Sequence, residues 1–200
     1  MHYITEISDK IKDIELRQNP VIITVNEFTE ESAQKSHAEM CLAHNSGQKV
    51  IPVEIDSYGG QVYALMSMIG AIKNSRLPVA TIVQGKAMSC GAILASFGSD
   101  GLRFMDKDST LMIHDVSSYA VGKIEELKAD AREAERLNTK VYTMMARNCG
   151  KPDDYFTKII HDKGHSDWFL EAEEAKEHKL IDHIRIPEMI IKVSVDIDLS

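Results

Sequence analysis

Residues 78–95 read PVATIVQGKAMSCGAILA, and this segment is the strongest indication of the architecture. Its apolar run predicts a strand, Gly85 begins a tight turn, and the small apolar residues after Ser89 predict a helix. A serine at such a junction has its hydroxyl at a helix N-terminus, where free N–H groups and the helix dipole favour developing negative charge. The arrangement resembles a nucleophile elbow without the Gly-x-Ser-x-Gly form, and the plainer interpretation is that Ser89 only caps the helix.

Strands that are each followed by a helix recur through the first half of the chain. Runs rich in β-branched residues predict the strands, and the expected strand-helix pairs are 20–25 with 29–43, 50–55 with 62–72, and 79–83 with the helix after Ser89. Thr29 is the expected cap of the first of these helices. Because consecutive β-α units build parallel sheets with crossover helices, the predicted fold class is α/β.

The second half of the chain begins with short strands and a long helix. Further strands are expected over 102–104, 110–114, 180–184 and 191–199, and helices over 124–147, 153–161 and 172–177. The helix over 124–147 is more charged than the earlier helices. It is therefore expected to project from the body or to pack against a partner.

Length and composition exclude several classes of protein. The chain has 200 residues, a hydrophobic content of 44% and a net charge of −8. These values favour one domain with a sizeable core and disfavour nucleic acid as a partner. With no long apolar run, no signal-peptide pattern and three widely spaced cysteines, we expect no membrane span, disulfide framework or zinc site, and a cytoplasmic location.

A serine nucleophile needs a base, and His114 is the candidate. It ends an apolar strand, in the next β segment after the Ser89 helix, and parallel-sheet sites gather at the carboxyl ends of strands. A lone histidine at a strand end is also compatible with a purely structural role. A carboxylate must then orient the imidazole, and the spacing leaves Asp115, Asp162 and Asp167 open, although Asp115 should point to the opposite face of its strand.

An acyl-transfer site also needs two N–H donors for the oxyanion. The amide of Cys90, directly after Ser89, is one candidate, and the Gly59-Gly60 pair between a strand and a helix offers a second. Taken alone, the glycine pair is most simply a tight turn. The Cys90 thiol either has a lowered pKa at the helix N-terminus or is buried as a small apolar group.

Taken together, these residues resemble the proteolytic subunit of the Clp protease. The segment 57–60 (SYGG) is similar to the family's Ser-Pro-Gly-Gly turn, and 85–92 (GKAMSCGA) is similar to its nucleophile segment Gly-x-Ala-Ala-Ser-Met-Gly-Ala. The segment 111–114 (LMIH) resembles Val-Met-Ile-His. The segment 167–175 (DWFLEAEEA) resembles Asp-x-Phe-Met-Ser-Ala-Glu-Glu-Ala, and 180–182 continues the match.

The resemblance, which covers about 50–184, implies a role for each candidate residue. Ser89 matches the nucleophile, His114 the general base and Asp167 the orienting carboxylate. Gly60 and Cys90 match the backbone donors of the oxyanion hole. The implied activity is that of a serine endopeptidase subunit of the ATP-dependent Clp type, which hydrolyses unfolded proteins and peptides without a metal or organic cofactor.

The resemblance also implies the architecture and the assembly. The expected fold is the ClpP/crotonase-like spiral of β-β-α units, in a protease domain over 19–184 with a protruding handle helix at about 122–149. An N-terminal arm over 1–18 and a C-terminal strand or tail over 185–200 flank it. In the family, handles of two heptameric rings interlock into a tetradecamer that encloses the active sites, and an AAA+ unfoldase docks on it.

Four positions depart from the family pattern. Asp115 stands where the family has glutamine, and it either raises the pKa of His114 or faces away. Ser166 replaces an arginine that helps to join the rings, which argues against a double ring. Pro52 and Glu54 replace aromatic residues in the pocket for the unfoldase's loop, which weakens the case for that partner.

Three other functions remain as alternatives. A catalytically impaired ring subunit would keep the scaffold. The segment 115–122 (DVSSYAVG) is compatible with it, because the family usually has Gln-Pro and a glycine pair there. A crotonase-fold acyl-CoA enzyme would share the glycine-based oxyanion hole but commonly uses carboxylate acid/base pairs. A serine-lysine protease of the signal-peptide-peptidase type would need a lysine where this chain has His114.

Overall fold

A computed structural model describes residues 20–117 and 121–189 of the chain. The arm expected over 1–18 and the strand expected over 191–199 lie outside these residues. Within the C-terminal tail, residues 185–189 form neither helix nor strand.

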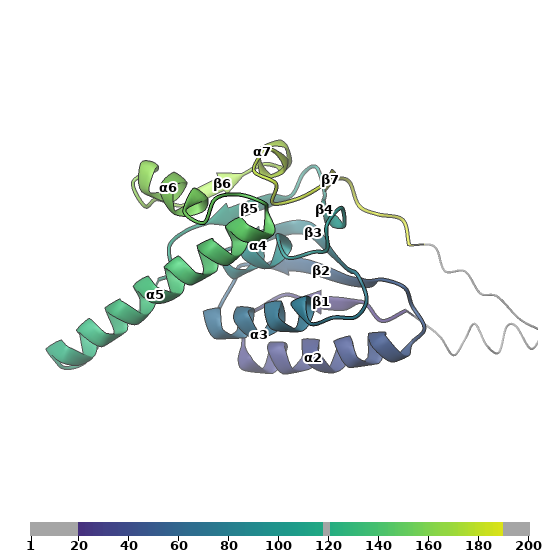
Figure 1. Cartoon of the computed structure of the whole chain (residues 1–200), viewed down its shortest axis with the longest axis horizontal. Helices are drawn as coiled ribbons and strands as arrows, with labels where there is room; N and C mark the ends of the chain where they lie inside the picture. Colours follow the sequence, from purple (N-terminus) through teal and green to yellow (C-terminus); the bar gives the residue numbers. More distant parts are fainter. Residues whose placement is uncertain (1–19, 118–120, 190–200) are drawn as a thin grey trace, which may run out of the picture.

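Five parallel strands form the body of the sheet, in agreement with the predicted α/β class (Figure 1). They lie in the order β1 (Ile23–Val25), β2 (Ile51–Ser57), β3 (Val79–Met88), β4 (Arg103–Met105) and β7 (His183–Ile184). Strand β2 buries Ile51, Val53, Ile55 and Ser57 on one face, whereas on its other face Glu54 is half-buried and Asp56 is exposed, as the alternation of side chains along a strand predicts.

Two amphipathic helices, α2 (Glu30–Asn45) and α3 (Val62–Lys73), lie together along one side of the sheet (Figure 1). Thr29 caps α2 as predicted: its hydroxyl accepts the Ser32 N–H at 3.1 Å, and the Ser32 hydroxyl accepts the Thr29 N–H at 2.9 Å. Both helices bury residues at helical spacing, in α2 Ala33, Ser36, Met40 and Ala43, and in α3 Ala64, Leu65, Met68, Ile69 and Ile72.

Strand β3 is longer than the predicted 79–83 and changes partner along its length. Its first half pairs with β4, where Ile82 lies opposite Phe104, and its second half pairs with β5 (Thr110–Ile113). Between the two halves the register against β2 shifts, and Gly85 adopts a φ of 85°, a left-handed conformation that glycine tolerates. The sequence prediction stopped at Val83 because polar residues follow it, whereas the pairing with β5 continues the strand.

Helix α5 (Ile124–Asn148) extends away from the body, as its charged sequence predicted (Figure 1). Its buried residues fall in the C-terminal half, namely Leu137, Val141, Tyr142, Met145 and Ala146. The N-terminal half is exposed, and it forms the protruding part of the fold.

The C-terminal part of the chain packs against α5 and against the β5 and β7 strands. Helix α6 (Tyr155–Asp162) is followed by β6 (Trp168–Leu170), which pairs antiparallel with β5, and then by α7 (Ala172–Glu177). Strand β6 was not predicted, because three residues are too few to show a period of two. The predicted strand over 180–184 is shorter than expected, since Leu180 and Ile181 are buried in a loop before β7.

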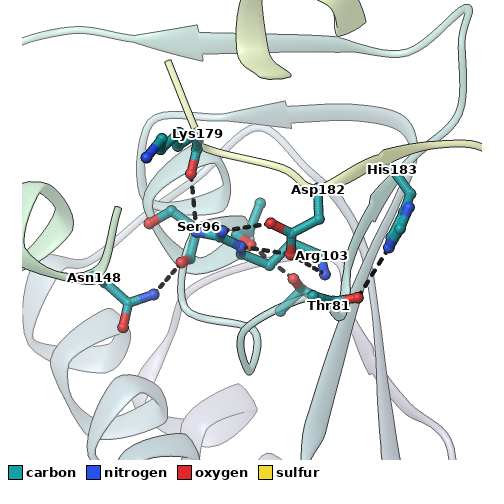
Figure 2. Close-up of polar contacts among 9 residues, drawn as sticks. Thr81, Ser96, Arg103, Asn148, Lys179, Asp182 and His183 are labelled. Atoms are coloured by element: carbon teal, nitrogen blue, oxygen red, sulfur yellow. Dashed lines mark hydrogen bonds and ion pairs between the residues drawn. The ribbon is translucent and has the colours of Figure 1, made fainter. Parts of the chain in front are cut away.

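A buried ion pair fastens this C-terminal segment to β4 (Figure 2). Asp182 accepts hydrogen bonds from the backbone N–H, Nε and Nη2 of Arg103, while Arg103 Nη1 donates to the carbonyl of Lys179. The Arg103 side chain is only 6% exposed. Because each of these donors has an oxygen acceptor, the buried charge is compensated.

Candidate active site

Ser89 lies between the last residue of β3 and helix α4 (Cys90–Ala95). Its backbone has φ 54° and ψ −118°, a conformation that is strained for a residue with a side chain. Although Ser89 occupies the N-cap position, its side chain makes no capping hydrogen bond, which argues against the plainer interpretation that Ser89 only caps the helix. The strained turn instead presents Oγ to His114, whose Nε2 lies 2.9 Å away.

Pairing between β3 and β5 brings these two residues together. Met88 lies opposite Met112, and the Ser89 N–H donates to the carbonyl of Met112 at 2.7 Å. His114 follows the last residue of β5. Both side chains therefore start from the carboxyl ends of adjacent parallel strands, where the sequence predicted a site.

The antiparallel pair β5–β6 brings Asp167 to the other side of the imidazole. Ile113 lies opposite Trp168, so His114 and Asp167 are the next facing positions. The distance from His114 Nδ1 to Asp167 Oδ1 is 3.7 Å, which is longer than a hydrogen bond. Asp162, which spacing had left open, ends α6 and lies 3.8 Å from His161 Nδ1 instead.

Asp115 directs its carboxylate to other partners than His114. Its Oδ1 accepts a hydrogen bond from Asn138 Nδ2 at 2.7 Å, and its Oδ2 lies 2.6 Å from His165 Nδ1. This agrees with the alternation of side chains along an extended chain. Neither Asn138 nor His165 was singled out from the sequence, and no local pattern marks them, because each is far from Asp115 in the chain.

The glycine pair lies directly against the Ser89 turn. Gly59 has φ 104°, and a methyl group on it would lie 2.8 Å from Ser89 Cβ. Gly60 forms an isolated bridge with Phe28, and a methyl group there would lie 2.5 Å from the Phe28 carbonyl oxygen. Both positions therefore require glycine for close backbone approach.

Cys90 connects the helix N-terminus to this glycine pair. As the first residue of α4 it carries one of the amides that a helix leaves without an intrahelical acceptor. Its thiol donates to the Gly60 carbonyl at 3.2 Å and is almost completely buried. Burial raises the pKa of the Cys90 thiol to about 11, so the hypothesis of a lowered thiol pKa is wrong.

A cavity of about 600 Å³ opens beside Gly60. The middle of α5, from Asp130 to Leu137, forms one wall, and the segment after His114, at Val116 and Ser117, forms another. Three carboxylates belong to the lining, those of Glu27, Asp130 and Glu133. Hydrogen bonds from Arg136 and Tyr63 lower the pKa of Glu133 to about 2, so that this carboxylate is ionised.

The other three departures from the family pattern are at Ser166, Pro52 and Glu54. The Ser166 hydroxyl donates to the Lys163 carbonyl at 2.7 Å, beyond the end of α6. Pro52 is buried within β2 and Glu54 on the same strand is half-buried. Neither residue supplies an exposed apolar surface.

Metal-binding and membrane features were sought over residues 20–117 and 121–189. Within them, no three His, Cys, Asp or Glu side chains converge as metal ligands. None of the helices there has the length and apolar character of a membrane span.

A comparison with protein-family models agrees with the geometry. The family described as Clp protease matches residues 6–188, which is most of the chain and includes every residue of the site.

Proposed function

Because this chain belongs to the Clp protease family, and is thereby a serine peptidase of the ClpP type, we propose that Ser89, His114 and Asp167 hydrolyse peptide bonds of unfolded proteins and peptides. The observation that carries the proposal is the 2.9 Å contact between His114 Nε2 and Ser89 Oγ. It joins a hydroxyl on a strained turn to a base whose other nitrogen faces a carboxylate.

In the proposed reaction, Ser89 Oγ attacks the carbonyl carbon of the scissile bond while His114 Nε2 takes its proton. The carbonyl oxygen gains negative charge, which the amides of Gly60 and Cys90 stabilise by hydrogen bonds. When the tetrahedral intermediate collapses, the C–N bond breaks and His114 protonates the leaving amine. Water, deprotonated by His114, then hydrolyses the acyl-enzyme and restores the Ser89 hydroxyl.

Asp167 orients the imidazole and stabilises its positive charge in this scheme. At 3.7 Å it is within range of electrostatic attraction but not of a hydrogen bond. Its side chain is 55% exposed, so solvent screens the attraction. A movement of somewhat less than 1 Å would form the hydrogen bond that the mechanism requires, and active-site contacts commonly tighten in this way when substrate binds.

The exposed apolar side chains before and at the start of α5 support self-association, and in the family this helix joins two rings. Val121 is 82% exposed and Ile124 is 71% exposed, and Leu127 lies one turn further along the helix. Apolar side chains on a projecting helix are stabilised when a second copy covers them. We infer a heptameric ring enclosing the active sites, with Ser166 weakening the pairing of two rings and with Pro52 and Glu54 disfavouring unfoldase docking.

Labelling with a fluorophosphonate probe tests the proposed nucleophile. The wild-type protein should react at Ser89, and Ser89→Ala should abolish labelling and peptidase activity together. Ser67→Ala, an exposed serine on α3, is the matched control and should label as the wild type does. Equal labelling of Ser89→Ala would refute the assignment, and the mass of the assembly in solution would show whether it has seven or fourteen subunits.

A catalytically impaired scaffold subunit is the second candidate. The long and exposed contact between His114 and Asp167 favours it, because a triad without its carboxylate loses most of its rate. A peptidase assay separates the two candidates. Activity that depends on Ser89 excludes the scaffold, whereas a ring-forming protein without labelling or activity supports it.

A further inference from the structure

We propose that Asp115 is a positioning residue, which holds the loop carrying Asp167 against the base of α5 and thereby sets the distance between Asp167 and His114. This inference rests on the proposed function. It concerns a residue that makes no contact with Ser89 or with the oxyanion donors, and it assigns a role to an aspartate that departs from the family pattern.

The first contact joins Asp115 to α5. Asn138 Nδ2 donates to Asp115 Oδ1 at 2.7 Å, while Asn138 Oδ1 accepts the Val116 N–H at 3.0 Å. One side-chain amide therefore binds both the side chain of Asp115 and the backbone that follows it. Because Asn138 is half-buried on the packed half of α5, it is a firm anchor for the segment directly after His114.

The second contact joins Asp115 to the loop that precedes β6. Asp115 Oδ2 lies 2.6 Å from His165 Nδ1, and His165 stands two residues before Asp167. His165 has φ 58°, and its N–H donates to the Ile160 carbonyl at 2.9 Å, so the loop turns tightly back on α6. Because only Ser166 separates His165 from Asp167, we expect a displacement of His165 to move Asp167 as well.

The carboxylate of Asp115 is partly shielded from solvent. Tyr142, one turn beyond Asn138 on α5, is fully buried, and within the described residues its hydroxyl has no hydrogen-bond partner. Burial, together with the nearby Asp115 charge, raises the pKa of Tyr142 above its usual range. Asp115 itself is 30% exposed, so its two hydrogen bonds are only partly screened by solvent.

The two neighbouring residues that follow β5, His114 and Asp115, therefore have different roles. His114 faces Ser89, and its neighbour Asp115 turns away to bind the loop that carries the opposing carboxylate. The register of β5 and β6 places Asp167 opposite His114, and Asp115 with His165 then adjusts the gap between them, which no direct hydrogen bond spans. Since a displacement of about 1 Å can change a catalytic rate by up to about 100-fold, this indirect link is sufficient to control turnover.

The test compares Asp115→Asn with a control, Asp162→Asn. The control makes the same substitution at an exposed aspartate that lies three residues before His165. Asp115→Asn should lower kcat about tenfold or more on a short peptide, with KM changed less than twofold, because only the orientation of the imidazole is affected. His165→Ala, which removes the same contact from its other side, should give a similar loss. Asp162→Asn should retain wild-type kcat.

Two further measurements separate positioning from general stability. In an Asp167→Ala background, Asp115→Asn should cause no additional loss, because the effect acts through Asp167. Amide hydrogen exchange over residues 164–167 should become faster in Asp115→Asn and stay unchanged in Asp162→Asn. Hydrogen exchange does not depend on activity. It therefore tests whether Asp115 holds the loop even if the wild-type protein is an inactive scaffold.

An unchanged kcat in Asp115→Asn would overturn the proposal. An equal loss of kcat on adding Asp115→Asn to the wild type and to the Asp167→Ala variant would contradict it. Unchanged hydrogen exchange over 164–167 would also overturn it. If Asp115→Asn fails to fold, His165→Ala is tested instead by the same criteria, because His165 is the more exposed partner of the contact. Absence of any Ser89-dependent activity in the wild type would contradict the proposed function instead, which keeps the two failures distinct.

Discussion

The thiol of Cys90 lies 3.2 Å from the carbonyl oxygen of Gly60, so the two residues whose amides are proposed to hold the oxyanion are also bonded to each other. The bond connects the start of α4 to the glycine pair between β2 and α3. It fixes the spacing of the two N–H groups, which must converge on one oxygen to be effective.

Replacing Cys90 tests this connection. Cys90→Ala removes the donor and should lower kcat about tenfold, less than the 10²- to 10³-fold loss typical of deleting an oxyanion donor, because the Gly60 N–H is displaced but not removed. Cys90→Ser retains a donor and should stay near wild-type activity. Equal activity of the Ala and wild-type proteins would show that the thiol does not position Gly60.

Burial of Cys90 also predicts its chemical behaviour. Because its thiol pKa is raised to about 11, iodoacetamide near neutral pH should alkylate the exposed Cys41 in the folded protein and leave Cys90 unmodified. Mass spectrometry of the digested protein identifies the modified residue. Rapid alkylation of Cys90 would contradict the buried, neutral thiol.

Gly59→Ala should abolish activity through a local clash. The added methyl group would lie 2.8 Å from Ser89 Cβ, and the φ of 104° is itself unfavourable for alanine by about 1–3 kcal/mol. Gly70→Ala is the matched control, since its methyl group would meet nothing within 4 Å inside α3 and should stabilise the protein by about 0.5–1 kcal/mol. Denaturant titration and a peptidase assay measure the two effects separately.

Loss of the Arg103–Asp182 pair should destabilise the fold. Asp182→Asn leaves a buried guanidinium without its counter-charge, which should cost about 3–5 kcal/mol of unfolding free energy. Asp153→Asn is the control, because both it and its partner Arg147 are exposed and solvent screens such pairs, so the unfolding free energy should change much less. Urea unfolding at neutral pH distinguishes these two outcomes.

The same pair predicts an acid dependence of stability. Burial of Asp182 opposes ionisation, but the hydrogen bonds and charge of Arg103 outweigh it and lower the carboxyl pKa below the ordinary aspartate value of 3.8. The stabilisation is therefore present at pH values above this ordinary value and is lost as the pH falls through the lowered pKa of the folded state. Asp182→Asn should lack this part of the acid transition, and an unchanged acid midpoint would argue against the pair as its source.

The cavity beside Gly60 predicts a preference among substrates. Because Glu27, Asp130 and Glu133 belong to its lining, peptides with lysine or arginine next to the scissile bond should be cleaved faster than their acidic counterparts. Asp130→Asn should reduce this ratio several-fold, and added salt should weaken it in the wild type. Glu125→Gln, on α5 but outside the lining, is the control, and a ratio insensitive to Asp130 would refute the electrostatic preference.

Local elements of the fold were predictable from sequence. The apolar runs over β2 and the start of β3, the Thr29 cap of α2 and the charged helix α5 were all expected, and the structure contains them. Each depends on residues within a few positions of one another, so periodicity and capping suffice to indicate them. Strand β6 and the extension of β3 to Met88 were missed, because a distant partner strand stabilises both.

The candidate site likewise combines features that the sequence predicted with features that depend on distant parts of the chain. Ser89 and His114 were recognisable from the strand-turn-helix pattern and the strand end, whereas spacing left three aspartates open and only the family resemblance favoured Asp167. The pairing of Ile113 with Trp168 supplies the geometric reason, since it places Asp167 opposite His114. The partners of Asp115 had no sequence signal, because Asn138 and His165 are 23 and 50 residues away.

The amino-acid sequence by itself determined the β-α order of the elements, the strand-to-helix junction at Ser89 and the glycines beside it. These follow from burial patterns and backbone preferences that act between near neighbours in the chain. Tertiary structure alone decided that β3 changes partner to β5, that β6 places Asp167 opposite His114, and that Asp115 binds α5 and the loop before β6. The physical reason is that strand pairing and packing join segments far apart in sequence, and their register fixes distances to within a fraction of an ångström.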